Sequence, residues 1–187
     1  MVFKSILTAL CTVVMISLPF GLRAENRASD LATGLLHDLS VAEDAAAAQR
    51  LEAQLLAEWS KSGSPAMDLL LKRGHDALEV EKIDAALEHF RALTDHAPMF
   101  AEGWHGLALA YFQAERFGVA MEALERTLAL NPNQFAAMRG VGAIQEQVGN
   151  PALAYDAYAR VLELRPHDPD VMKALARLEQ EVKGVKL

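Results

Sequence analysis

The stretch that decides the fold runs from Ala101 to Pro132 and reads AEGWHGLALAYFQAERFGVAMEALERTLALNP. In each half, side chains that share one helical face recur three or four residues apart: Trp104, Leu107, Ala108 and Tyr111, then Ala120, Leu124 and Leu128. Pro132 ends the second helix, because it lacks a backbone N–H and disfavours helical geometry at Asn131. The stretch therefore predicts two short amphipathic helices folded back on each other.

The same pattern stands before and after this stretch at an interval of 34 residues. The repeated positions hold the closing prolines Pro98, Pro132 and Pro166, and the alanines Ala86, Ala120 and Ala154. A small residue recurs at Gly74, Ala108 and Gly142, and a large one at Phe90, Leu124 and Tyr158. Small residues let two helix backbones approach closely while large ones fill the space around them. Because one such hairpin cannot bury both of its apolar faces, the three units are expected to stack.

This register resembles the tetratricopeptide repeat family over about residues 67–183. The resemblance implies an all-α fold, a right-handed α-solenoid of three helix pairs at 67–100, 101–134 and 135–168. It also implies that the first helices of successive repeats line a concave groove that holds an extended peptide or a helix.

The residues on either side of the array break the 34-residue register. Residues 25–64 predict a helical hairpin that caps the first repeat, with a second helix opening at the capping box Ser40–Glu43. Trp59 near its end is expected to pack with Leu70, and the alternative is an exposed aromatic that binds a partner. Residues 169–187 predict a C-terminal capping helix and tail that shield the last hairpin.

Residues 1–24 have the pattern of a secretory signal peptide. Lys4 precedes an uncharged, mostly apolar run over residues 5–22, and Pro19 interrupts that run before Ala24, where cleavage is expected. The mature protein would then be secreted or periplasmic. The alternative is an uncleaved anchor on the periplasmic face of the inner membrane, since the run approaches the roughly 20 apolar residues that span a bilayer.

The formal charge of the 187-residue chain is −7. Removal of the leader takes away Lys4 and Arg23 and no acidic residue, which changes the charge from −7 to −9. Such an acidic balance argues against binding to nucleic acid. The single cysteine, Cys11, lies in the leader, so the mature chain would use neither a disulfide nor a thiol nucleophile.

The sequence holds no phosphate-binding glycine loop, no zinc-protease motif and no serine-hydrolase motif. His75 and His105 fall on successive first helices in the resemblance, but two imidazoles without a third ligand predict no metal site. The numerous carboxylates lie on polar helix faces. The sequence therefore predicts neither an enzyme nor a cofactor.

The resemblance implies that the residues at the inner positions of the repeats form the partner-binding groove. These residues are Leu71, His75, Leu78, Glu102, His105, Leu109, Phe112, Arg139, Ala143, Glu146, Lys173 and Arg177. Apolar members would make a floor, with cationic groups gathered toward the C-terminal end. This layout suits a partner segment with apolar side chains and an acidic tip. The chaperone-tail version of the groove is not expected, because Leu71, His75 and Gly106 replace its lysine and asparagines.

The sequence thus predicts a protein–protein interaction adaptor of the bacterial cell envelope whose partner is a protein or peptide. The alternative is an inner-membrane-anchored scaffold or assembly factor in cytochrome or cell-wall biogenesis, with the leader retained.

Overall fold

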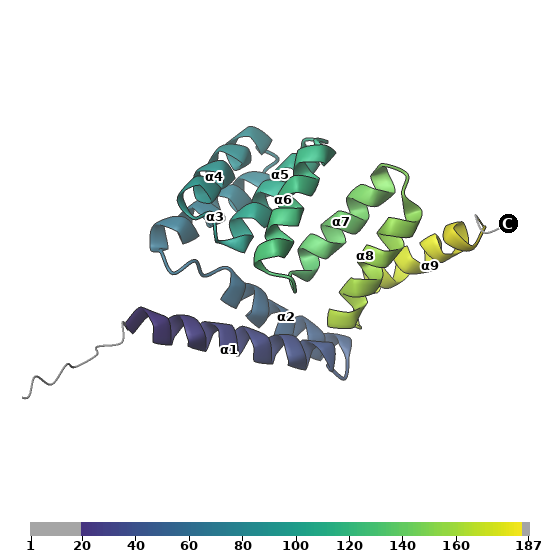
Figure 1. Ribbon diagram of the computed structural model, residues 1–187, viewed down its shortest axis with the longest axis horizontal. Coiled ribbons are helices and arrows are strands. Elements are labelled where there is room, and N and C mark those ends of the chain that lie inside the picture. Colours follow the sequence, from purple (N-terminus) through teal and green to yellow (C-terminus); the bar gives the residue numbers. More distant parts are fainter. Residues whose placement is uncertain (1–19, 185–187) are drawn as a thin grey trace, which may run out of the picture.

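A computed structural model describes the backbone of residues 20–184, and the side chains of residues 30–182 within it. Over the described backbone the ordered elements are all helices: α1 (Phe20–Ser40), α2 (Ala45–Trp59), α3 (Pro65–Glu79), α4 (Ile83–His96), α5 (Ala101–Gln113), α6 (Phe117–Leu130), α7 (Phe135–Gln147), α8 (Pro151–Leu164) and α9 (Pro169–Gly184). From α3 to α8 they form three antiparallel pairs stacked side by side (Figure 1). The fold is therefore the expected all-α solenoid with flanking helices.

The three repeated alanines lie where the two helices of a pair cross. Ala86, Ala120 and Ala154 are each 0% exposed. Each begins the buried stripe of a second helix, and the large residue four positions later lies in the same core. The prediction that small residues mark the helix crossings is confirmed.

In the first and third repeats the recurring small residue is a glycine that lies against an aromatic ring. A Cβ placed on Gly74 would lie 2.5 Å from the Phe90 ring, and one on Gly142 would lie 2.6 Å from the Tyr158 ring. In the second repeat the same two positions hold Ala108 and Leu124, so a smaller partner leaves room for a methyl group. Each repeat thus keeps a matched pair of small and large residues, as close packing requires.

The turn inside each repeat needs one residue in the left-handed region. Glu81 and Glu115 have φ of 57°, and Gly149 has φ of 80°. Glycine adopts this backbone conformation without a steric penalty, whereas glutamate pays one. Only the third turn is marked by glycine in the sequence, which is why it is the easiest of the three to predict.

The first two helices differ from the sequence prediction at their ends. α1 begins at Phe20, before the start of the predicted hairpin at residue 25, and no proline interrupts residues 20–30. The predicted capping box at Ser40 is wrong. Asp44 caps α2, its side chain accepting a hydrogen bond of 2.7 Å from the N–H of Ala47, and a helix begins more favourably after such a residue.

The predicted signal peptide lies partly outside the described residues. Residues 20–24 belong to α1, and residues 1–19 are not described. Within residues 20–184, no helix is both long enough and apolar enough to cross a bilayer.

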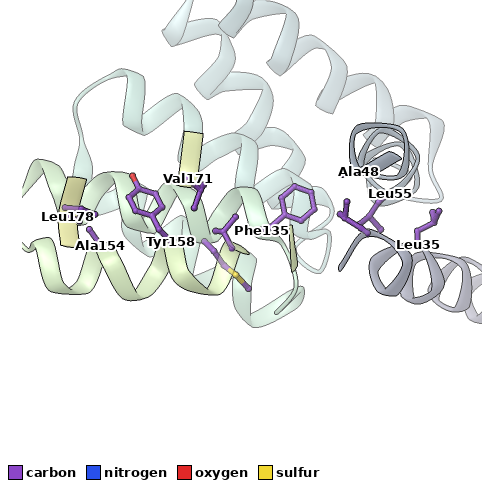
Figure 2. Close-up of a cluster of buried hydrophobic side chains, with 11 residues drawn as sticks. Leu35, Ala48, Leu55, Phe135, Ala154, Tyr158, Val171 and Leu178 are labelled. Carbon is purple, nitrogen blue, oxygen red and sulfur yellow. The ribbon is translucent and has the colours of Figure 1, made fainter. Parts of the chain in front are cut away.

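The N-terminal hairpin of α1 and α2 lies along the turns that join successive repeats (Figure 1). Leu35, Leu39 and Leu55 belong to one buried cluster with Phe135 of α7 and Val161 of α8 (Figure 2). The expectation that the hairpin covers the first repeat is therefore corrected, because its apolar residues contribute to the core of the third.

Trp59 is the last residue of α2. Its ring centroid is 5.5 Å from that of Phe135, while Leu70 packs in the separate core of the first repeat. The prediction that Trp59 packs with Leu70 is wrong, because α2 ends beside the turn before α7. The half-buried indole is nevertheless packed inside the molecule, as an aromatic of this size favours.

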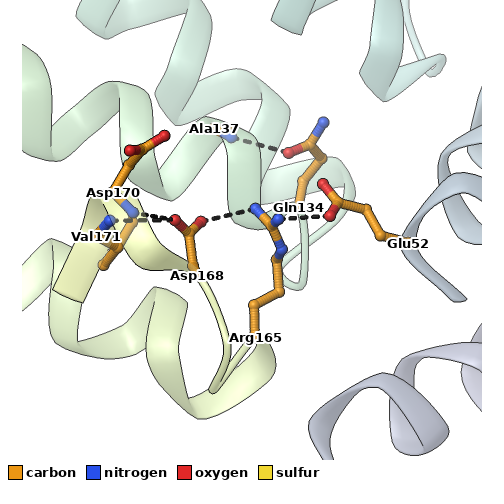
Figure 3. Close-up of polar contacts among 7 residues, drawn as sticks. All are labelled: Glu52, Gln134, Ala137, Arg165, Asp168, Asp170 and Val171. Atoms are coloured by element: carbon orange, nitrogen blue, oxygen red, sulfur yellow. Dashed lines mark hydrogen bonds and ion pairs between the residues drawn. The ribbon is translucent and has the colours of Figure 1, made fainter. Parts of the chain in front are cut away.

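Polar contacts hold the hairpin to the turn between α8 and α9 (Figure 3). The Arg165 guanidinium pairs with Glu52 of α2 and, at 2.8 Å, with Asp168. The guanidinium carbon also lies 4.7 Å from the centre of the Phe135 ring. In the same turn His167 Nε2 lies 2.8 Å from the Ala42 carbonyl oxygen. One turn thus joins the hairpin to the last repeat.

α9 closes the C-terminal end of the array. Asp168 caps it, its Oδ1 accepting hydrogen bonds of 3.1 Å from the N–H groups of Asp170 and Val171. Val171 and Leu178 are buried, whereas Met172 is 52% exposed. The face of α9 that packs on the last repeat is therefore the one that carries Val171 and Leu178.

Candidate functional site

A pocket of about 220 Å³ opens between α5 and α7, the first helices of the second and third repeats. We call it the α5–α7 pocket. Its lining residues are His105, Ala108, Leu109, Phe112, Leu124, Ala136, Arg139, Gly140, Ala143 and Ile144. Five of them, His105, Leu109, Phe112, Arg139 and Ala143, are groove residues that the sequence predicts. The structure therefore brings the central part of the predicted groove together.

The walls of the α5–α7 pocket are mainly apolar. Leu109 and Phe112 are half-buried, and Phe112 rests against Phe117 with ring centroids 5.4 Å apart. Gly140 leaves the bottom of the α5–α7 pocket open, because a side chain at this position would fill that space and its Cβ would lie 3.2 Å from Leu124. Arg139 is exposed at the rim. An apolar cavity with one cation at its edge can hold an apolar side chain that has an acidic neighbour.

A buried polar cluster lies beside the pocket. Gln134 is 0% exposed, and its Nε2 donates a 3.1 Å hydrogen bond to Glu102 Oε1. The same nitrogen lies 3.3 Å from His105 Nδ1. Gln134 Oε1 accepts a 2.8 Å hydrogen bond from the N–H of Ala137 (Figure 3). The cluster therefore links α5 to the first turn of α7.

The pKa values in this region are displaced. Burial raises the pKa of Glu102, but the neighbouring His105 and the hydrogen bond from Gln134 outweigh that effect and hold the pKa below its usual range. Burial lowers the pKa of His75, and the neighbouring His105 lowers it further. Glu102 is consequently an anion at neutral pH and His75 is uncharged.

The first repeat does not supply the predicted apolar floor. Leu71 and Leu78 are only 5% and 9% exposed and pack in the core between α3 and α4. His75 stands edge-on to Phe90, with ring centroids 5.3 Å apart. The prediction that these two leucines are open to a ligand is corrected, because close stacking of the repeats covers them.

The C-terminal end of the predicted groove is partly occupied by its own contacts. Arg177 of α9 pairs with Glu146 of α7, and Lys173 is exposed. Burial, and next a hydrogen bond to Glu146, raise the pKa of Tyr158. Because the Glu146 carboxylate neutralises Arg177, the C-terminal end of the groove carries less positive charge than the sequence predicts.

Sequence reasoning missed Gln134, Ala136, Gly140 and Ile144. Gln134 occupies the last position of a 34-residue unit, where a polar residue ordinarily faces solvent. Its burial depends on Glu102 and His105 in the preceding repeat. No local pattern reveals such a contact, since glutamine is not among the residues favoured as N-caps.

A larger cavity of about 370 Å³ lies between the N-terminal hairpin and the turns that join the repeats. Trp59 and Phe100 contribute to its walls, and the Glu58 carboxylate there pairs with Lys61. Its mixed lining offers less apolar contact than the α5–α7 pocket, which is therefore the stronger candidate site. Among residues 30–182, no group of three histidine, cysteine or acidic side chains is placed to hold a metal ion.

Comparison with known proteins identifies the array. Residues 71–124 and 107–179 match two models of the tetratricopeptide repeat. A TPR repeat-containing protein of Rhizobium etli is 27% identical over 150 residues, which cover 80% of this chain and 74% of that protein. The CTR9 homolog of Arabidopsis thaliana is 32% identical over 132 residues, which cover 70% of this chain but only 11% of that protein.

Solved structures with the same arrangement include the first TPR domain of Spaghetti (RPAP3) bound to the HSP90 peptide SRMEEVD. It has a TM-score of 0.60 and 26% identity, and the match covers 63% of this chain and 93% of that one. MamA has a TM-score of 0.58 and 21% identity, with coverage of 85% and 84%, and shares the fold. Residues 71–179 of this chain therefore consist of tetratricopeptide repeats.

Proposed function

We propose that this protein is a non-enzymatic adaptor that holds a peptide or helix of another protein in its concave groove. The observation that carries the proposal is the α5–α7 pocket, where Leu109 and Phe112 form an apolar wall and Arg139 stands at the rim. One apolar side chain of the partner would enter the pocket, and an acidic neighbour would pair with Arg139.

The charge pattern supports an acidic partner segment. Among the ion pairs of residues 30–182, none involves Arg139, so its guanidinium is available to a carboxylate. The Spaghetti domain, with the same fold, is bound to the HSP90 peptide SRMEEVD. Here Leu71, His75 and Gly106 stand where the chaperone-tail grooves carry lysine and asparagine, so a different acidic sequence is the proposed ligand.

The proposed location is the bacterial cell envelope, with the mature protein secreted or periplasmic. The leader pattern of residues 1–24 supports it. The alternative is a retained leader that anchors the protein in the inner membrane. The alternative function is an inner-membrane-anchored scaffold or assembly factor in cytochrome or cell-wall biogenesis. N-terminal sequencing of the expressed protein distinguishes the two, because a start at Glu25 excludes the anchor.

A photo-crosslinking experiment tests the groove. Benzoylphenylalanine placed at Phe112 should capture a partner segment, and the same residue at Leu153 on α8, which is 53% exposed, should not. Mass spectrometry of the adduct then identifies the captured peptide.

A pair of double variants tests which side chains bind. Phe112→Ala with Arg139→Ala should lose the captured peptide, while the matched control Leu153→Ala with Arg160→Ala on α8 should retain it. Equal retention by both variants, with the helical content unchanged, would show that the groove is not the binding surface.

A further inference from the structure

The cavity between the N-terminal hairpin and the turns of the array differs in chemistry from the α5–α7 pocket, and we call it the hairpin cavity. Its volume of about 370 Å³ lies in the range of small-molecule sites, roughly 300–1,000 Å³. Leu36 of α1, Trp59 of α2 and Phe100, which precedes α5, contribute apolar groups to its walls. No residue lines both cavities. An inference about the hairpin cavity therefore does not depend on the function proposed for the pocket.

Glu102 supplies a carboxylate to the wall of the hairpin cavity. The residue is 8% exposed, and its Oε1 accepts the hydrogen bond of 3.1 Å from Gln134. Its Oε2 accepts no hydrogen bond from residues 30–182. Among these residues, His105 Nε2 is the one fully buried side-chain nitrogen or oxygen without a partner. Glu102 Oε2 is therefore not sealed off, and it remains open to the cavity that Glu102 lines.

The Glu102 carboxylate has no close cationic partner in the described part of the chain. Its place in the first turn of α5 favours the charged form, because a helix N-terminus attracts an anion. His105 Nδ1 lies 3.6 Å from Oε2, which is too far for a hydrogen bond. Within residues 30–182, no lysine or arginine forms an ion pair with Glu102. A largely buried carboxylate without such a partner is costly, and a bound cation would reduce that cost.

The other groups in the hairpin cavity determine what kind of cation fits. Its second carboxylate, Glu58, already pairs with Lys61. The half-buried Trp59 indole packs on Phe135 and also lines the cavity, as does Phe100. Aromatic rings attract cations and pack well against alkyl groups. The cavity therefore suits a ligand that carries one positive charge on an apolar body.

We propose that the hairpin cavity binds a small organic cation, in which an ammonium or guanidinium group is carried on an apolar chain. The charged group pairs with Glu102 Oε2, and the apolar chain lies against Trp59, Phe100 and Leu36. The walls of the cavity come from both the hairpin and the array. A ligand that contacts both therefore also stabilises the docking of the hairpin.

NMR titration of the unmodified protein with hexylammonium, and separately with the uncharged 1-hexanol, tests this site at neutral pH. The protein has two tryptophans, and Trp104→Phe assigns their indole N–H signals. Hexylammonium should move the Trp59 signal saturably and bind about tenfold more tightly than 1-hexanol, the effect of one hydrogen bond to a charged group. The Trp104 indole donates to the Pro98 carbonyl outside the cavity, at 2.9 Å, and its signal should stay in place. A Trp59 signal that does not move, or equal affinities for the two probes, would overturn the site.

A substitution tests whether Glu102 provides the charge. Glu102→Gln should bind hexylammonium no more tightly than 1-hexanol, whereas the matched control Glu125→Gln, at an exposed position of α6, should keep the tenfold preference. A preference that persists in Glu102→Gln would overturn the role of this carboxylate. If that variant does not fold, the comparison of the two probes on the unmodified protein still decides the site. Stronger binding of an acetylated Gly-Lys-Gly peptide than of hexylammonium would assign the cavity to a lysine side chain of a protein partner and overturn the small-molecule ligand.

Discussion

The indole of Trp59 packs against the ring of Phe135, with the two centroids 5.5 Å apart. Trp59 ends α2 of the N-terminal hairpin and Phe135 begins α7 of the third repeat, so the hairpin and the third repeat share a core. The Arg165 guanidinium lies on the Phe135 ring and pairs with Glu52 of the hairpin. A repeat array ordinarily transmits stability only between neighbours. Here the N-terminal hairpin, which precedes the first repeat in the chain, packs instead into the core of the third.

Trp59→Ala tests this coupling. Removing the indole exposes Phe135 and should lower the free energy of unfolding by about 2–3 kcal/mol, less than for a fully buried ring. Leu69→Ala on α3 is the control, since Leu69 is 46% exposed and its loss should cost no more than about 0.5 kcal/mol. Urea unfolding followed by circular dichroism measures both. Equal effects would show that the hairpin packs independently.

Gly142→Ala tests the matched pair in the third repeat. The new methyl group would lie 2.6 Å from the Tyr158 ring, so overpacking should destabilise the protein by about 1–3 kcal/mol. The double variant with Tyr158→Leu reproduces the Ala108 and Leu124 pair of the second repeat. It should be more stable than the sum of the two single effects predicts. Additive effects in thermal or urea unfolding would contradict the pairing.

Glu115→Gly should stabilise the protein. Glu115 has a φ of 57°. Replacing a non-glycine residue in this left-handed conformation by glycine should raise the free energy of unfolding by about 1 kcal/mol. The extra conformational entropy of glycine in the unfolded chain reduces this gain. Glu122→Gly in the exposed middle of α6 is the matched control and should cost about 1 kcal/mol. The two changes should therefore move the urea midpoint in opposite directions. A lower midpoint for Glu115→Gly would refute the strain argument.

Because of His75, we expect the folded protein to lose stability in mild acid. Its pKa is lowered from the ordinary value of 6.5 in the folded protein, so the unfolded chain takes up the proton first as the pH falls. The stabilisation from the neutral imidazole is complete above 6.5 and is lost as the pH falls through the lowered native value. Unfolding midpoints measured on both sides of that range should show the decline. His75→Gln should flatten it, whereas His96→Gln at an exposed site should not.

Much of the array could be predicted because the information is local. The spacing of Ala86, Ala120 and Ala154 follows from the helical period and from the need for small residues at crossings. The helix starts at Pro151 and Pro169 follow from proline at the first helical position, and Asp168 also caps the second of these helices. The start of α2 is an exception, since both Ser40 and Asp44 are acceptable caps and only the end of α1 excludes the first.

The groove was harder to predict than the fold. His105, Leu109, Phe112 and Arg139 meet in one pocket as the family resemblance implies, whereas Leu71 and Leu78 are covered. Both groups occupy equivalent positions in their repeats. The difference arises from how closely neighbouring helices approach, and no single repeat contains that information.

The sequence by itself determined that this chain forms helix pairs with alanine and glycine at their crossings, because helical periodicity, capping and side-chain size act over a few residues. Only the tertiary structure decided that the hairpin docks against the third repeat, that Gln134 lies buried between Glu102 and His105, and which groove residues stay open. Those outcomes depend on the angles at which successive pairs stack, and each angle results from many weak contacts between residues far apart in the chain.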